Sequence, residues 1–170
     1  MKKSSVLDLV FMAFYVALFM VLDYMTNMLS ILQMPQGGSL GISTIALLMA
    51  SYHLGWQKGL MVSCVSILAQ FVTGPMYTPD LLGFLLDYGL AFSVYGLACL
   101  FPNVSWFYSG VLVTNLVRFL SSTISGVIVY QTTWLASVGY NASYMIPTCI
   151  LGLILIPVLD NALKRYTKRV

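Results

Sequence analysis

The stretch that decides the fold is LLGFLLDYGLAFSVYGLACLF, residues 81–101, an apolar run of membrane-spanning length that contains one carboxylate, Asp87. An ionised carboxylate at the centre of a spanning helix costs about 3 kcal/mol or more, so it persists only where protein, water or a ligand compensates it. We therefore expect Asp87 and the adjacent Tyr88 to face the interior of a helix bundle. We interpret this stretch as the floor of a binding site. The alternative is a structural acid that pairs with another helix, for example through Arg118.

The composition of the whole chain indicates an integral membrane protein. Of its 170 residues, 59% are hydrophobic and 8% are charged, and the mean hydropathy is +0.90. At about 20 residues per span, the chain has room for roughly six helices and no separate soluble domain. We expect an all-α fold with six transmembrane helices and a single domain over residues 1–170. The net charge of +3 comes from the chain ends, which suits an anionic membrane surface and gives no support for nucleic-acid binding.

The apolar runs define where the helices should cross the bilayer. The expected spans are residues 6–22, 43–56, a third that follows the turn at Lys58 and ends near Thr73, 81–101, 106–130 and 141–159.

The distribution of basic residues predicts the orientation. With six spans, the N-terminus, the turn at Lys58 and the C-terminal tail share one side and hold seven of the eight basic residues. That side should be cytoplasmic. The first loop, residues 24–42, then faces outward, and it is long and apolar enough to act as a lid over a cavity. The alternative is a re-entrant or interfacial segment.

The fifth expected span carries a polar stripe. Asn115, Arg118, Ser122 and Ser125 follow one another at intervals of three, four and three residues, which places them on one helical face. Such a stripe should point into the bundle, with Arg118 paired to another group. Ser122 lies nearer the level of Asp87, and a direct Asp87–Arg118 contact would require tilted helices.

Catalytic and metal chemistry find little support. The one histidine, His53, has no acid or cysteine at ligand spacing, and the three cysteines show no CxxC pattern, so we expect no metal and no cofactor. An intramembrane serine hydrolase built on Ser122 fails because His53 should lie near the opposite end of the bundle, beyond reach of a nucleophile. We expect no enzyme. A membrane scaffold without a ligand remains open.

Four motifs, taken together and in order, resemble one family. They are MPQGGSL at 34–40, LLDYGLAF at 85–92, NLVRFLSSTISGVI at 115–128 and YNASYMIP at 140–147. The chain is similar to the thiamine-type substrate-binding (S) components of bacterial energy-coupling factor (ECF) vitamin transporters. Ala13 and Ala17, one turn apart in the first span, also resemble the AxxxA docking motif of that family.

The resemblance implies a function and partners. An S component captures a vitamin at the outer face of the bacterial plasma membrane and docks through its first helix, here Ala13 and Ala17, onto a transmembrane coupling protein driven by two ATPases. The sequence contains no GxxxxGK[ST] phosphate loop, so any ATP must be hydrolysed by a partner.

The resemblance also assigns site residues. The family's acid and tyrosine fall on Asp87 and Tyr88, its helix-five aromatic on Tyr130 and its helix-six asparagine on Asn141. Two positions depart from the family pattern: Ser122 replaces a histidine, and a tyrosine of the family is absent where this chain has Ala136.

The residues that remain suit a smaller ligand than thiamine. Hydrogen bonds would come from Asp87, Ser122 and Asn141, and stacking would come from Tyr88, Tyr130, Trp134 and Tyr140. This set suits one flat heteroaromatic ring with exocyclic polar groups. We therefore expect a thiamine-related single ring, hydroxymethylpyrimidine or a pyridoxine-like vitamin, with thiamine itself as the alternative.

Overall fold

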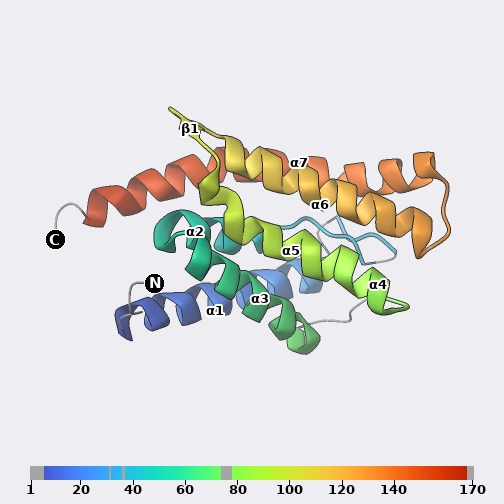
Figure 1. The fold of residues 1–170 in the computed structure, drawn as a ribbon, viewed down its shortest axis with the longest axis horizontal. Coiled ribbons are helices and arrows are strands. Elements are labelled where there is room, and N and C mark those ends of the chain that lie inside the picture. The colour runs from blue at the N-terminus through green and yellow to red at the C-terminus, as the bar shows by residue number, and fades with distance from the viewer. Residues whose placement is uncertain (1–5, 31, 36, 74–77, 168–170) are drawn as a thin grey trace.

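The computed structural model of the chain describes residues 6–30, 32–35, 37–73 and 78–167. This part of the chain is mostly helical, and its helices run along the long axis of the molecule (Figure 1). The beginning of the first helix and the end of the last lie at the same end of the bundle. The expectation of a helical fold is therefore confirmed.

The elements follow one another simply along the chain. The long helices are α1 (Val6–Met28), α2 (Thr44–Leu54), α3 (Trp56–Thr73), α6 (Ser109–Ile128) and α7 (Trp134–Thr167). Between α3 and α6 a helical run changes type three times: α4 (Leu81–Phe84), the π-helix η1 (Leu85–Leu90), α5 (Ala91–Ser93) and the 3₁₀-helix η2 (Val94–Leu100). A short antiparallel hairpin of β1 (Asn103–Val104) and β2 (Phe107–Tyr108) then leads into α6.

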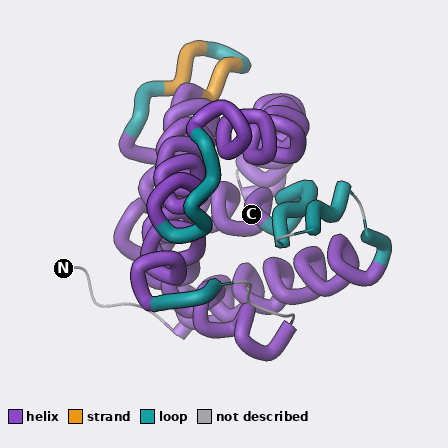
Figure 2. The backbone as a smooth tube through the Cα atoms, turned by 90° about the vertical axis from the view of Figure 1, so that its right-hand side faces the viewer, coloured by secondary structure: helices purple, strands orange, loops and turns teal. Residues whose placement is uncertain are grey.

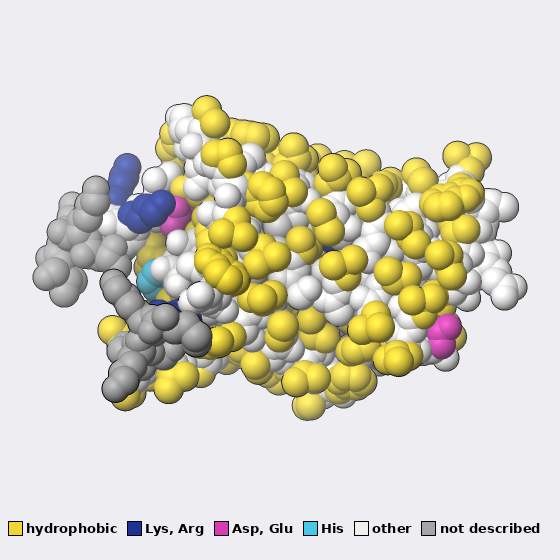
Figure 3. Space-filling model, in the orientation of Figure 1, with side chains coloured by type: hydrophobic (Ala, Val, Ile, Leu, Met, Phe, Trp, Pro, Cys, Tyr) yellow, Lys and Arg dark blue, Asp and Glu magenta, His cyan; other side chains and the backbone are white. Residues whose placement is uncertain are grey.

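Four helical segments of the described chain are long and apolar enough to cross a bilayer. They are Val6–Met28, Leu81–Leu100, Ser109–Ile128 and Trp134–Arg165. Their outward surfaces carry large exposed hydrophobic side chains, which cover the face seen in Figure 3, while lysine and arginine side chains appear at one end. An apolar exterior of this kind is what a lipid environment requires.

The first and last helices are longer than the hydropathy pattern predicts. Helix α1 continues past Leu22, because polar side chains near its end bond within the helix: Thr26 Oγ1 donates to the Leu22 carbonyl over 2.7 Å. Helix α7 likewise begins at Trp134, inside the connection expected at 131–140. There Asn141 Nδ2 donates to the Ser137 carbonyl over 3.0 Å. Polar residues in the sequence therefore do not mark the end of α1 or the beginning of α7.

Helix α2 is too short to cross a bilayer by itself. Its 11 residues extend about 16 Å, and residues 44–51 are all buried among the other helices. The non-helical segment before it packs inside the protein, where the Gly41 N–H donates to Thr148 Oγ1 over 2.9 Å. Non-helical backbone is tolerated at membrane depth where protein satisfies it in this way. In Figure 2 the loop segments are seen from the end of the bundle where α4 lies.

Helices α3 and η2 meet in direct backbone contact at two glycines. A Cβ atom placed on Gly96 would lie 2.5 Å from the backbone nitrogen of Leu60, and one on Gly59 would lie 2.8 Å from the Gly96 carbonyl oxygen. Glycine lets these backbones touch, as small residues do at membrane helix interfaces. The contact holds the run that carries Asp87 firmly against the centre of the bundle.

Candidate functional site

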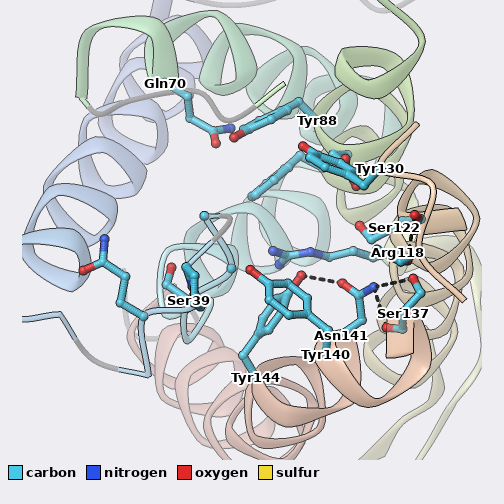
Figure 4. A pocket seen from close by; sticks show the side chains of 18 of the residues that line it. Ser39, Gln70, Tyr88, Arg118, Ser122, Tyr130, Ser137, Tyr140, Asn141 and Tyr144 are labelled. Atoms are coloured by element: carbon cyan, nitrogen blue, oxygen red, sulfur yellow. Dashed lines mark hydrogen bonds between the residues drawn. The ribbon is translucent and has the colours of Figure 1, made fainter. Parts of the chain in front are cut away.

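A cavity of about 510 Å³ lies between the helices, and the part of α7 that lines it is at the opposite end of the bundle from the C-terminus (Figure 1). Its wall combines aromatic rings with carboxylates, carboxamides, hydroxyls and one guanidinium. The lining residues come from α1 (Asp23, Asn27), the first loop (Gln33, Pro35, Gly37, Gly38, Ser39), α3 (Gln70), the run after α4 (Asp87, Tyr88, Phe92), α6 (Arg118, Ser122, Gly126), the segment after it (Tyr130, Thr132) and α7 (Ala136, Ser137, Tyr140, Asn141, Tyr144). Figure 4 shows many of these side chains converging on one space.

Asp87 and Tyr88 lie within the π-helical turn η1. A π-turn breaks the regular i to i−4 bonding, and such turns occur frequently at functional sites. Helix α6 donates to this turn twice: Ser121 Oγ to the Leu86 carbonyl and Ser125 Oγ to Asp87 Oδ2, each over 2.6 Å. The half-buried carboxylate of Asp87 is therefore held in place by α6.

An aromatic column runs down the same wall. Phe84, Tyr88 and Phe92 stack at one-turn intervals, with centroid separations of 6.0 and 6.1 Å and interplanar angles of 16° and 14°. The guanidinium carbon of Arg118 lies 4.5 Å from the Phe92 centroid, a cation–π contact. Tyr88 and Phe92 of this column line the cavity, beside the buried positive charge of Arg118.

Arg118 is bound by aromatic residues rather than by an acid. It is buried, and its Nη1 is 3.5 Å from the Tyr95 hydroxyl, which in turn donates to Asn115 Oδ1 over 2.9 Å. Among the described residues the ion pairs join Lys58 to Asp8 and Lys164 to Asp160, and none joins Arg118 to Asp87. The alternative interpretation, in which Asp87 is the ion-pair partner of Arg118, is therefore not supported within the described residues.

Asn141 forms the opposite wall. Its carboxamide is buried and engaged at both ends: Nδ2 donates to the Ser137 carbonyl over 3.0 Å, and Oδ1 accepts from the Tyr144 hydroxyl over 2.7 Å (Figure 4). Tyr140 packs edge-on against Tyr144 at 6.0 Å. This wall is rigid and aromatic.

The structure brings six of the seven residues expected to bind a ligand to one cavity. These are Asp87, Tyr88, Ser122, Tyr130, Tyr140 and Asn141. Trp134 is different: it is 60% exposed at the start of α7 and does not line the cavity. Both positions that depart from the family pattern, Ser122 and Ala136, do line it.

Sequence reasoning missed several lining residues. Asp23 follows the expected first span and Asn27 falls in the expected loop at 24–42, yet both belong to α1, and Tyr144 lies near the start of the expected span at 141–159. Gln70 could have been found: Ser63, Ser66 and Gln70 are spaced three and four residues apart, which is a second inward polar stripe. That signal was as clear as the stripe on α6.

His53 and the expected docking residues lie elsewhere. The Tyr15 hydroxyl is 2.9 Å from His53 Nδ1, in the last turn of α2, and His53 does not line the cavity. Within the described residues no three His, Cys, Asp or Glu side chains are grouped to hold a metal. Ala13 and Ala17 line a separate apolar groove between α1 and α3, together with Met12, Val16, Met20, Met61, Val62 and Val65.

These features define a class: a multi-pass helical membrane protein that encloses a polar and aromatic cavity of a size suited to a small molecule. The chain belongs to the thiamine transporter protein family, whose model matches residues 9–168. It is also similar to the thiamine transporter ThiT of Bacillus subtilis (strain 168), at 27% identity over 98% of this chain and 97% of that protein. The resemblance to thiamine-type vitamin transporters and the expected location in a bacterial membrane are therefore confirmed.

Proposed function

We propose that this chain is the substrate-binding component of an ECF-type transporter and captures a thiamine-related vitamin or precursor at the outer face of the membrane. The observation that carries the proposal is the polar and aromatic cavity, with the carboxylate of Asp87 held in its wall by Ser125. A buried carboxylate beside stacked rings suits a flat ligand that has donor or cationic groups. Partner subunits would supply the energy for uptake.

The proposed topology has six crossings with both termini in the cytoplasm. Lys58 at the start of α3 and Lys164 and Arg165 in the last turn of α7 support this orientation, because the cavity is lined instead by the other end of α7, which lies across the bundle in Figure 1. Helix α2 would complete its crossing with the packed segment that precedes it. The cavity then opens toward the exterior.

The first loop is proposed to act as the lid. Its described residues Gln33, Pro35 and Ser39 line the cavity, and Gly38 packs so closely that a Cβ there would lie 2.5 Å from Tyr144 Cε1. A ligand could enter only past these residues if the other walls remain closed. This placement supports a lid that closes over the site.

For the ligand, we propose a single heteroaromatic ring such as hydroxymethylpyrimidine or a pyridoxine-like vitamin. Ser122 and Ala136 support this choice, since both lie in the cavity wall and neither supplies the imidazole or phenol of the family pattern. Thiamine is the alternative ligand, and membership of the thiamine transporter family favours it. The cavity volume also allows it, because about 510 Å³ falls within the range of sites that hold drug-sized molecules.

Calorimetric titration of the detergent-purified chain tests both levels of the proposal. Hydroxymethylpyrimidine, pyridoxine and thiamine are titrated separately. Saturable binding of any one supports a thiamine-related binding component, and a single-ring compound that binds more tightly than thiamine supports the finer assignment. Thiamine affinity far above both would overturn the single-ring choice, and no binding of any of the three would overturn the proposed function.

The groove between α1 and α3 is proposed as the docking surface for the coupling protein. Ala13 and Ala17 are both exposed, and they form its floor between methionine and valine side chains. Small residues of this kind allow a partner helix to approach the backbone closely. The groove is separate from the cavity, so docking and ligand capture would use different surfaces.

A further inference from the structure

Gln70 has the features of a ligand-binding residue that neither the family pattern nor the sequence analysis identified. It lies one turn before the end of α3, is 7% exposed and lines the cavity. Figure 4 shows its side chain beside Tyr88, across the cavity from Asn141 and Tyr144.

The carboxamide nitrogen of Gln70 is buried and has no hydrogen-bond partner within the described part of the chain. Buried polar groups in native proteins are nearly always satisfied, and each exception calls for an explanation such as a missing bound molecule. The cavity provides the explanation, because a ligand that fills it would meet this wall.

Comparison with Asn141 sharpens the point. Both carboxamides are more than nine-tenths buried in the cavity wall. Asn141 donates to the Ser137 carbonyl and accepts from the Tyr144 hydroxyl, so its carboxamide holds these two parts of the cavity wall together. Gln70 retains a donor for which no described residue is an acceptor.

We propose that Gln70 is a specificity-determining residue of the cavity, whose carboxamide N–H donates to an acceptor atom on the edge of a heteroaromatic ligand. The acceptor is a ring nitrogen, and the ring itself lies against Tyr88. This inference rests on the proposed function and names one contact within it.

The alternative is that Gln70 belongs only to the packing of α3. Ser63 and Ser66 on the same helical face are also buried with unpartnered hydroxyls. They do not line the cavity, whereas Gln70 does. Ser66 therefore offers a matched control: the same helix and face, the same unpartnered state, but no access to a ligand.

The test compares Gln70→Leu, Gln70→Glu and Ser66→Ala with the unaltered chain. Each is titrated calorimetrically with hydroxymethylpyrimidine and thiamine, and with the analogues of each in which one pyrimidine nitrogen is replaced by C–H. We expect Gln70→Leu and Gln70→Glu to lose about tenfold or more in affinity for a parent compound, the loss expected when a buried hydrogen bond is removed. The unaltered chain should bind the analogue that lacks the acceptor nitrogen about tenfold more weakly than the parent compound. Gln70→Leu should weaken the binding of that analogue little further. Ser66→Ala should bind as the unaltered chain does.

Stability supplies a second readout. Because no described residue accepts from the Gln70 donor, Gln70→Leu should keep or raise the melting temperature while it lowers affinity. Affinity within about twofold of the unaltered chain, or equal losses for parent and every analogue, would overturn the role of Gln70. Failure of the unaltered chain to bind either parent compound would instead overturn the proposed function, so the two failures are distinguishable.

Discussion

Ser125 donates a hydrogen bond of 2.6 Å to Asp87 Oδ2, and this contact ties α6 to the π-helical turn that carries the acid. Ser121, one turn earlier on α6, binds the Leu86 carbonyl in the same turn. Two serines on one face of α6 therefore support both the irregular backbone and the carboxylate. The polar stripe of α6 therefore contacts Asp87 through a serine hydroxyl, and among the described residues no ion pair joins Arg118 to the acid.

Removal of the charge at position 87 should weaken ligand binding. Asp87→Asn preserves size, and we expect it to lower affinity by about tenfold to a hundredfold, since hydrogen bonds to charged groups contribute about 1.5–3 kcal/mol. Calorimetry in detergent measures the loss. Asp80→Asn is the matched control, because Asp80 caps α4 through the Gly83 N–H at 2.7 Å and asparagine caps a helix equally well. If Asp87→Asn and Asp87→Ala both bind and support uptake normally, a scaffold without a ligand becomes the better interpretation.

The purified chain should bind its vitamin without accumulating it. Its sequence has no phosphate-binding loop, and only five acidic residues, all aspartates, are present to couple uptake to an ion gradient. Proteoliposomes that contain this chain alone should show no concentrative uptake of radiolabelled ligand, whether or not ATP or an ion gradient is supplied. Accumulation by the chain alone would contradict its role as a component that needs partners.

A bulky residue in the α1–α3 groove should block assembly but not capture. Ala17→Trp fills the groove next to Val62, so we expect loss of co-purification with the coupling protein and ligand affinity within about twofold of the unaltered chain. Ala13→Trp should behave in the same way. The control is Leu116→Trp, a change at a 53% exposed position on α6 away from the groove. Equal weakening of ligand binding and assembly by Ala17→Trp would show that this face is assigned wrongly.

Restoring the family residues should shift ligand preference toward thiamine. Ser122→His together with Ala136→Tyr returns an imidazole and a phenol to the cavity wall, where both positions lie. We expect the ratio of thiamine affinity to hydroxymethylpyrimidine affinity to rise by about tenfold, which corresponds to 1.4 kcal/mol. Leu135→Tyr is the control, because Leu135 is 84% exposed and does not line the cavity. An unchanged or reduced ratio in the double variant would argue that these two positions do not set the preference.

The sequence by itself determined the environment of the chain and the approximate place of its site. Composition and apolar run lengths indicate a membrane protein because the bilayer demands long apolar helices. A lone acid such as Asp87 points inward for the same reason, since lipid cannot solvate it. The i, i+3 and i+4 spacing likewise placed Ser122 and Ser125 on one face.

Only the tertiary structure decided the partners and the limits of the helices. Arg118 lies on aromatic rings of the run after α4, a contact that depends on how two helices cross and not on spacing within either. Trp134 turns away from the cavity because α7 already begins there, so helical phase, not proximity in sequence, directs its side chain. Hydrogen bonds within the helix carried α1 past Leu22, and packing brought Gln70 to the cavity. Hydropathy reports the cost of transfer into lipid, whereas these features depend on which side chains meet across the bundle.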